Sequence, residues 1–367
     1  MKHVAMLLPT IDRIGGAESQ VLLLTRGLSA RGWRVSLVTL SGDGGDAAEA
    51  LAADGIRHFS LKMRKGLAEP RGWWRFQLWL RREQPSIIHA HLPHAAWFAR
   101  WSRMLYSSSA VVDTIHTSST GTPGRQYGYR LSDRFADLVT AVSGSCADAY
   151  IKKGMVKPQH LRVIPNGIDI EAWSPDLGAQ SAIRSELGIT GKFLWLAAGR
   201  LEPVKDYPTL LHAIALLDDP AHLAIAGSGD RDPALRALAR QLKIESRVTF
   251  LGFQQNLKRW IQAADGFVQA SLWEGLPMAA LEAAACGIPT VATDVPGTRD
   301  VVRPNVSGLL TPAGNAAALA DAMHSIMRLP QDDRAEMGRL ARKHVAEHFS
   351  LNHALDLWES AYAELLR

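Results

Sequence analysis

The feature that most constrains the fold is an alternation between short runs rich in Val, Ile and Leu and longer stretches with helical periodicity. Buried strands of parallel sheets have this composition, and the helices that connect them fill the intervals. The pattern restarts after VIPNGIDIEAW, residues 163–173, a connector that carries Pro and Gly. A chain of 367 residues also exceeds one ordinary core. We therefore predict an α/β fold with two doubly wound, Rossmann-like domains.

The strands that this pattern predicts lie at 3–8, 34–40, 86–90, 110–115, 138–142, 193–198, 222–226, 247–250, 266–269 and 289–292. The helices that it predicts lie at 17–30, 46–53, 71–83, 93–105, 126–136, 206–217, 232–242, 255–263 and 277–286, and the last residues form an amphipathic helix. Ligands of such sheets bind beyond the carboxyl ends of the strands. The motifs that follow strands are therefore the candidates for a site.

Composition and charge narrow the class of protein. The two cysteines, Cys146 and Cys286, lie in apolar segments, which favours buried thiols over disulfides or a cysteine-rich metal site. The N-terminal MKHVAMLLPT is too short for a membrane span and has no signal-peptide cleavage pattern, so we expect a cytoplasmic protein. Residues 1–168 carry 22 Lys and Arg against 12 Asp and Glu, whereas residues 169–367 carry 19 against 24. The basic half suits an anionic partner, such as nucleic acid, an acidic membrane or a phosphorylated acceptor.

The segment SLWEGLPMAALEAAACGIPTVAT, residues 271–293, keeps two acids, Glu274 and Glu282, among small apolar residues. Gly275 permits an unusual backbone after the strand, and Pro277 suits the first turn of a helix. The backbone N–H groups near Leu276–Met278 would then form an anion site. Carboxylates beside such a site suit a ligand with phosphate and hydroxyl groups, that is, a nucleotide sugar. The alternative is a solvated helix face.

Two more motifs follow strands. In LAAGRLEPVKDYPTL, residues 196–210, Arg200 and Lys205 could neutralise a diphosphate, although such side chains are often merely solvated. Gly15 and Gly16 precede a predicted helix, where backbone can approach an anion closely; an ordinary turn is the alternative. Because this loop lacks G-x-G-x-x-G and no acid ends the second strand, a nicotinamide enzyme is disfavoured.

Together, the spaced Glu274 and Glu282, GRLEPVKDY, VIPNGID, AGSGD and GGAE resemble the retaining glycosyltransferases of the GT4 family, which have the GT-B fold. The resemblance covers nearly the whole chain and is strongest from 163 to 311. It implies two Rossmann-like domains that face each other across a cleft. The acceptor-side domain would comprise 1–168 plus 350–367, because the final helix crosses back, and the nucleotide-sugar domain would comprise 169–349.

The resemblance also implies roles on the donor side. Glu274 would bind sugar hydroxyls, and Glu282 the ribose. Arg200 and Lys205 would hold the diphosphate. The backbone residues that would assist are Leu276, Pro277 and Met278 at the diphosphate, next to Gly275, and Phe253, Gln254 and Gln255 at the base.

On the acceptor side, Gly15 and Gly16 would lie over the donor phosphates and the acceptor, and His116 would orient the donor sugar. Many members have His-Asp at that position, whereas this chain has Thr117 after His116, so a carboxylate partner from the next residue is missing. Members of the family work without a bound metal, and this chain lacks an Asp-x-Asp motif at a strand end. We expect no metal and no further cofactor.

Two other clusters admit alternatives. His89, His91 and His94 could form a metal set, but strand-end histidines are the better interpretation. Residues 62–82, KMRKGLAEPRGWWRFQLWLRR, combine seven Lys and Arg with three Trp. This composition suits peripheral contact with an anionic membrane, or else a core helix with solvated arginines. Nucleic acid is disfavoured because no recognition motif accompanies the charge.

These observations predict a retaining glycosyltransferase that moves a hexose-type sugar from a nucleotide diphosphate sugar, most simply a UDP-sugar, to a glycan or lipid-linked acceptor in cell-surface polysaccharide synthesis. We expect it in the cytoplasm, peripheral on the inner face of the membrane if residues 62–82 dock there. A nucleotide-sugar epimerase, a glycosyl phosphorylase and a non-catalytic nucleotide-binding module are the alternatives.

Overall fold

The computed structural model describes residues 2–12, 14–64, 69–176, 178–218 and 220–367. The chain divides into two compact units. The first unit comprises Met1–Gly167 and Leu351–Arg367, and the second comprises Ile168–Ser350. Each unit is a parallel sheet covered by helices, which confirms the predicted fold class.

The sheet of the first unit has seven parallel strands in the order β3-β2-β1-β4-β5-β6-β7. These strands are β1 (His3–Leu8), β2 (Arg34–Thr39), β3 (Arg57–Ser60), β4 (Ile87–His91), β5 (Ala110–Ile115), β6 (Leu138–Ala141) and β7 (Leu161–Val163). The helices are α1 (Gly16–Ala30), α2 (Gly45–Ala53), α3 (Pro70–Glu83), α4 (Pro93–Ser102), α5 (Pro123–Ser132), α6 (Gly144–Lys152) and α15 (Leu351–Leu365). Strands β2 and β3 are added on one side of β1, and β4 to β7 on the other. The point between β1 and β4 is therefore a topological switch point, where ligands of such sheets bind.

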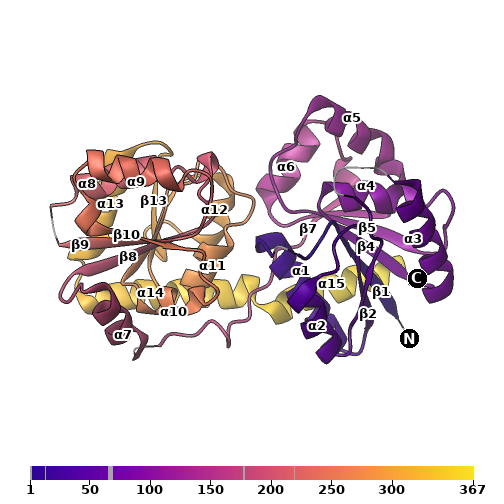
Figure 1. The fold of residues 1–367 in the computed structure, drawn as a ribbon, viewed down its shortest axis with the longest axis horizontal. Coiled ribbons are helices and arrows are strands. Elements are labelled where there is room, and N and C mark those ends of the chain that lie inside the picture. The colour runs from indigo at the N-terminus through magenta and orange to yellow at the C-terminus, as the bar shows by residue number, and fades with distance from the viewer. Residues whose placement is uncertain (1, 13, 65–68, 177, 219) are drawn as a thin grey trace. The chain divides into compact units, whose positions relative to one another are not determined.

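Helices α1, α2 and α15 cover one face of this sheet, and α3 to α6 cover the other (Figure 1). The helix α15 belongs to the first unit because its apolar side chains complete the core against α1 and β1. Of the four apolar residues that the sequence places on one side of this helix, Leu355, Trp358 and Ala361 are buried and Leu365 is half-buried.

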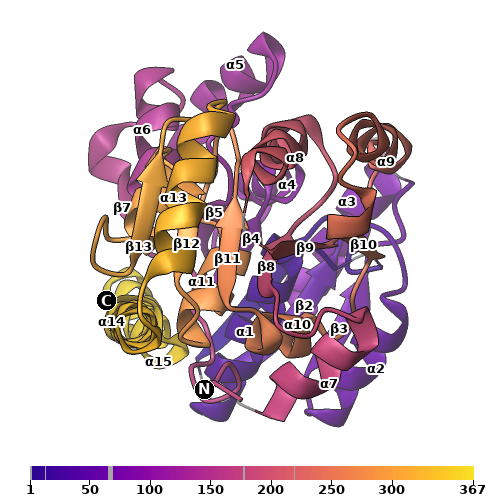
Figure 2. The same ribbon diagram turned by 90° about the vertical axis from the view of Figure 1, so that its left-hand side faces the viewer.

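The sheet of the second unit has six parallel strands in the order β10-β9-β8-β11-β12-β13, seen from right to left in Figure 2. They are β8 (Phe193–Ala198), β9 (Ala221–Ala226), β10 (Val248–Gly252), β11 (Gly266–Gln269), β12 (Thr290–Thr293) and β13 (Gly308–Thr311). The helices are α7 (Gly178–Leu187), α8 (Tyr207–Leu216), α9 (Asp232–Gln241), α10 (Leu257–Ala263), α11 (Met278–Ala285), α12 (Pro296–Val301), α13 (Ala316–Arg328) and α14 (Gln331–Phe349). The switch point of this sheet lies between β8 and β11.

Every predicted strand is present, with limits shifted by at most two residues. Two predicted helices in the first unit need correction. The helix predicted at 93–105 ends at Ser102, whose hydroxyl donates to the Ala99 carbonyl. The helix predicted at 126–136 begins at Pro123, because the Thr122 side chain caps its N-terminus by accepting from the Arg125 N–H. It ends at Ser132, after which Asp133–Phe135 form a 3-10 turn.

Three further sequence-based expectations concern the cysteines, a metal site and a membrane-spanning helix. Cys146 and Cys286 are buried thiols, as predicted. Within the described residues, no group of three or more His, Cys, Asp or Glu side chains is arranged to hold a metal ion. Over the same residues, no helix has both the length and the apolar character that crossing a membrane requires.

Candidate functional site

The clearest polar constellation of the second unit lies at the switch point of its sheet. Lys205 is in the turn that follows β8, and Glu274 is in the turn that follows β11. The Lys205 Nζ lies 2.6 Å from the Glu274 Oε1, which also accepts a 2.6 Å hydrogen bond from the Ser271 hydroxyl. Both charged side chains are largely buried, with 21% and 11% of their surface exposed. The structure thus brings together two residues that the sequence named separately.

Backbone contacts fix the two turns that carry this ion pair. The N–H of Leu272 donates to the Val204 carbonyl at 2.8 Å, which joins the turn after β11 to the turn after β8. The Tyr207 hydroxyl donates to the Gly199 carbonyl at 3.0 Å. Because these contacts hold the backbone on both sides, Lys205 and Glu274 are presented from a rigid edge of the sheet.

Glycines allow the loop after β9 to pack closely on the loop after β8. A Cβ at Gly227 would lie 1.9 Å from the Gly199 carbonyl oxygen, and Gly227 has a φ of 154°. A Cβ at Gly229 would lie 2.7 Å from the Leu201 carbonyl oxygen. The glycines of the AGSGD motif are therefore required for the loop after β9 to pack on the loop after β8.

Arg200 is placed differently from Lys205. Its guanidinium pairs with Glu202 at 2.7 Å, and 78% of its side chain is exposed. The structure therefore does not bring Arg200 into the Lys205–Glu274 pair.

Glu282 lies on α11, whose first helical residue follows Glu274 by four positions. Burial raises the pKa of the Glu282 carboxyl to about 8. Pro277 is the N-cap of α11 and not part of its first turn, which corrects the sequence-based placement. Its carbonyl accepts from the N–H groups of Ala280 and Leu281.

The other residues that the sequence assigned to the donor side lie near this helix start and beyond β10. Gly275 and Leu276 are buried, and Met278 is half-buried. Phe253, Gln254 and Gln255 form the turn after β10. The Gln254 amide is engaged there, since it accepts from the Trp260 indole N–H and donates to the Leu251 carbonyl.

In the first unit, Gly15 and Gly16 lie at the exposed start of α1, after β1. The Gly15 N–H donates to the Glu18 carboxylate at 3.0 Å, and a Cβ at Gly15 would lie 2.8 Å from this carboxylate. Gly16 is the first residue of the helix.

His116 directly follows β5 and is half-buried. Its Nε2 lies 3.1 Å from the Nδ1 of His91, and burial lowers the pKa of His116 to about 4. His89 and His91 are buried in β4, as predicted for strand-end histidines, whereas His94 is exposed. The imidazole of His116 is therefore neutral at pH 7.

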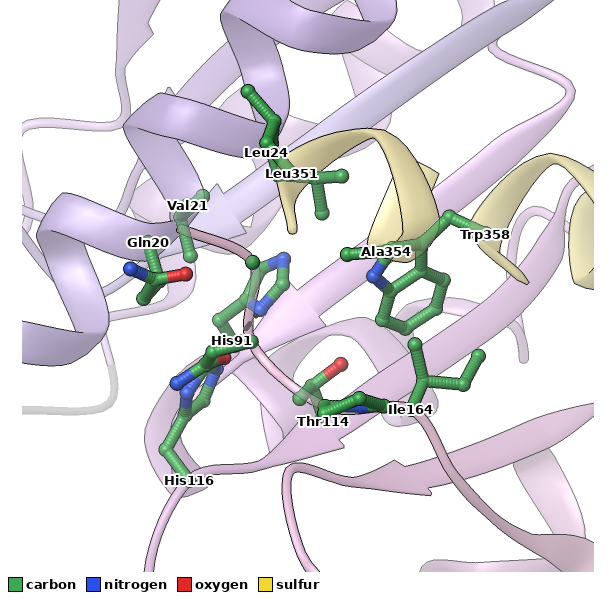
Figure 3. Close-up of a pocket in the computed structure, with 13 residues that line it drawn as sticks. Gln20, Val21, Leu24, His91, Thr114, His116, Ile164, Leu351, Ala354 and Trp358 are labelled. Atoms are coloured by element: carbon green, nitrogen blue, oxygen red, sulfur yellow. Dashed lines mark hydrogen bonds between the residues drawn. The ribbon is translucent and has the colours of Figure 1, made fainter. Parts of the chain in front are cut away.

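A small cavity of about 20 Å³ lies beside these histidines. Figure 3 shows Gln20 and Val21 of α1 on one side of it and Trp358 of α15 on the other, with His91, Thr114 and His116 from the ends of β4 and β5. The sequence analysis did not single out His91 as a partner of His116. Their contact depends on the pairing of β4 with β5, which the sequence pattern does not give.

The comparisons with known proteins give the class first. The family model "Glycosyl transferases group 1" matches residues 179–344, and the model "Glycosyltransferase Family 4" matches residues 14–172. A D-inositol 3-phosphate glycosyltransferase of Saccharomonospora viridis is 32% identical over 307 residues, covering 77% of this chain and 70% of the relative. The chain belongs to the GT4-type glycosyltransferases, as the sequence predicted.

Two further similarities add detail. The "UDP-Gal:alpha-D-GlcNAc-diphosphoundecaprenol alpha-1,3-galactosyltransferase" of Escherichia coli is 25% identical over 303 residues, with 78% of this chain and 77% of the relative covered. A crystal structure of Anabaena Alr3699/HepE in complex with UDP and glucose superposes with a TM-score of 0.87 at 20% identity, covering 99% of this chain and 100% of that one. The fold is GT-B, as predicted.

Proposed function

We propose that the protein is a retaining glycosyltransferase that transfers a hexose-type sugar from a UDP-sugar to a glycan or lipid-linked acceptor in cell-surface polysaccharide synthesis. The observation that carries the proposal is the Lys205–Glu274 pair at the switch point of the second sheet. The Anabaena protein in the similar structure holds UDP and glucose, and the name of the Escherichia coli relative specifies UDP-Gal and a diphosphoundecaprenol-linked acceptor. Both support this donor and acceptor class.

In this proposal the Lys205–Glu274 pair exchanges partners when the donor binds. Without a donor, each charge neutralises the other in a partly buried position, where an unpaired charge would be costly. With the donor present, Lys205 turns to the diphosphate and Glu274 accepts from sugar hydroxyls. Arg200, which is exposed on the neighbouring loop, rotates to add a second positive charge. Because these side chains supply the positive charge, we propose a reaction without a metal or other cofactor.

The demanding step is the departure of the diphosphate. The bond between the sugar C1 and the phosphate oxygen breaks, and the electron pair leaves with UDP. The acceptor hydroxyl forms the new C1–O bond on the same face, and its proton passes to the leaving phosphate oxygen, so configuration is retained. Catalysis is then chiefly electrostatic stabilisation of the leaving charge by Lys205.

Other residues position the two substrates. Glu282 binds the ribose, and backbone at Phe253–Gln255 holds the base. The backbone from Leu276 to Met278 contributes N–H groups to the diphosphate. Gly15 and Gly16 allow backbone to approach the donor phosphates and the acceptor, and His116 orients the donor sugar as a neutral imidazole.

We further propose that the protein works in the cytoplasm, peripheral on the inner face of the membrane, through the helix α3. Its inner face packs in the core, where Trp79 stacks on Phe59 and Phe76 with ring centroids 6.0 and 6.1 Å apart. Its outer face presents the exposed residues Arg71, Trp74, Arg75, Leu78, Arg81 and Arg82. The packed face agrees with the core-helix interpretation, and the exposed face supports the proposed membrane contact because arginines with an exposed Trp suit anionic headgroups. Residues 65–68 of the stretch lie outside the described residues.

A panel of nucleotide sugars tests the function. The protein is incubated with each donor and a lipid-extract acceptor fraction, and the nucleotide and the glycosylated product are followed by mass spectrometry. Release of UDP together with acceptor glycosylation supports the proposal. Donor conversion without an acceptor product indicates an epimerase, dependence on free phosphate indicates a phosphorylase, and nucleotide binding without turnover indicates a binding module.

A further inference from the structure

The hydrogen bond between His91 and His116 constrains both imidazoles. Its 3.1 Å length joins the Nδ1 of His91 to the Nε2 of His116, and the ring centroids are 5.3 Å apart. The strand register explains the contact, because His91 lies opposite Thr114 and His116 follows two residues later. Figure 3 shows both imidazoles at the same side of the cavity. The remaining nitrogens, the His91 Nε2 and the His116 Nδ1, are buried, and neither has a hydrogen-bond partner among the described residues.

The proton on this bond couples the tautomers of the two rings. If His116 donates from Nε2, the neutral His91 carries its own proton on Nε2 as well. If His91 donates from Nδ1, the neutral His116 carries its proton on Nδ1 as well. The two rings therefore share one tautomer, so the protonated nitrogen of His116 always matches the protonated nitrogen of His91.

A neighbouring chain of hydrogen bonds shows that the surroundings of His91 are fixed. The Asp113 carbonyl can only accept, so the Thr140 hydroxyl donates to it at 3.2 Å. Thr140 must then accept from the Thr114 hydroxyl, and Thr114 in turn accepts from the His89 Nε2 at 2.7 Å. The Nδ1 of His89 therefore accepts from the Tyr362 hydroxyl of α15 at 2.6 Å. Because every one of these bonds has a defined direction, His89 is held in a single neutral tautomer.

His91 is held against this fixed ring. The centroids of His89 and His91 are 4.0 Å apart. Directly after His91 the chain turns at Leu92, which has a φ of 71°, a strained conformation for a bulky side chain. Strain of this kind persists where the surroundings over-determine it. The ring of His91 thus packs against His89, and the backbone of His91 leads directly into a sharp turn.

We propose that His91 is a positioning residue for the transfer reaction, which holds the His116 ring in one orientation and one tautomer toward the donor sugar. The inference rests on the proposed function, in which His116 contacts that sugar. His91 itself contacts no substrate in this account and acts only through its bond to His116.

An isosteric pair of substitutions tests the role. Asn at position 91 places an amide where the Nδ1 of His91 lies and can donate or accept, whereas Leu has the same shape and no hydrogen bond. We expect His91→Leu to lower kcat with the accepted UDP-sugar by about tenfold to a hundredfold, by analogy with the loss of a hydrogen-bond partner that orients a metal-ligating histidine. Neither KM for the donor nor the Kd for UDP should change, and His91→Asn should restore most of kcat.

Long-range ¹H–¹⁵N spectra of histidine-labelled protein give a readout that does not depend on turnover. The His116 signals, assigned by their loss in His116→Ala, should show a single tautomer in the wild type and averaged tautomers in His91→Leu. Averaged tautomers in the wild type would overturn the inference, and this result stands even if His91→Leu fails to fold.

Kinetic measurements distinguish a failure of the proposed role of His116 from a failure of the role of His91. If His116→Ala turns over normally, the proposed role of His116 fails, and the inference fails with it. If His116→Ala is slow while folded His91→Leu keeps the wild-type kcat, the proposed function stands and only the role of His91 is refuted. Equal losses of kcat in His91→Leu and His91→Asn would also refute it, because packing alone would then explain both.

Discussion

Replacing Glu282 by Gln should stabilise the protein in a pH-dependent manner. Burial raises the pKa of Glu282 to about 8 from an ordinary value of 4.5. Between these two values the folded state holds a proton on Glu282 that the unfolded state has lost. Stability from this group is therefore fully present below pH 4.5 and falls as the pH rises toward 8.

The magnitude follows from the two pKa values. Each pH unit in this window costs about 1.4 kcal/mol, so the loss reaches about 3 kcal/mol at pH 7 and about 5 kcal/mol above pH 8. Gln has nearly the same shape and cannot ionise. Glu282→Gln should therefore match the wild type near pH 4.5 and exceed its free energy of unfolding by about 3 kcal/mol at pH 7.

Urea unfolding at pH 4.5, 7 and 8.5 measures the difference, with Glu171→Gln as a control at an exposed position of the same unit. The control should show no comparable pH-dependent gain. A Glu282→Gln difference that is the same at all three pH values would refute the reasoning, because burial of an ionisable group would then not be its cause. The same variant should bind UDP more weakly by calorimetry, since an amide replaces the carboxyl group that the proposal places against the ribose.

Further predictions concern Glu274, His116 and the helix α3. Glu274→Ala should leave UDP affinity nearly unchanged by calorimetry while transfer is lost, and the reverse pattern would show that its role and that of Glu282 are exchanged. His116→Ala should lower turnover with little effect on UDP affinity, and a variant that does not fold would instead indicate a core histidine. Trp79→Ala should lower the free energy of unfolding by about 3–5 kcal/mol, whereas Trp74→Ala should lower vesicle binding alone. Sedimentation with anionic vesicles should show binding that weakens with salt, and no binding to them would exclude membrane docking. Each cation near such a surface contributes about 1 kcal/mol to binding. Most binding should therefore be lost when Gln replaces the exposed arginines of α3, which are Arg71, Arg75, Arg81 and Arg82.

The sequence predicted the interior of both sheets because a strand buried on both faces needs a continuous apolar run. The six residues of β1, for example, are all buried. The strands β3, β7 and β13 escaped prediction because they lie at sheet edges and are partly exposed, so RHFS, LRV and GLLT lack such a run. Edge strands carry weak patterns for this physical reason.

The candidate site shows a similar limit. Motifs after strands identified Lys205 and Glu274 individually, because strand ends and helix starts have local signatures. Their pairing could not be predicted, since it depends on β8 and β11 being neighbours in the sheet. The same holds for His91 and His116, which the register of β4 and β5 brings together. Spatial pairing of strands distant in sequence is a tertiary property.

The central claim is that Lys205 stabilises the leaving diphosphate of a nucleotide sugar. The most direct measurement is the rate of UDP release from the accepted UDP-sugar, in the presence of acceptor, by the wild type, Lys205→Ala and the exposed control Lys343→Ala. Loss of a charged contact to the leaving group should slow Lys205→Ala by about 10²–10³-fold while its fold is kept, and the control should match the wild type. A wild-type rate of UDP release in folded Lys205→Ala would contradict the account.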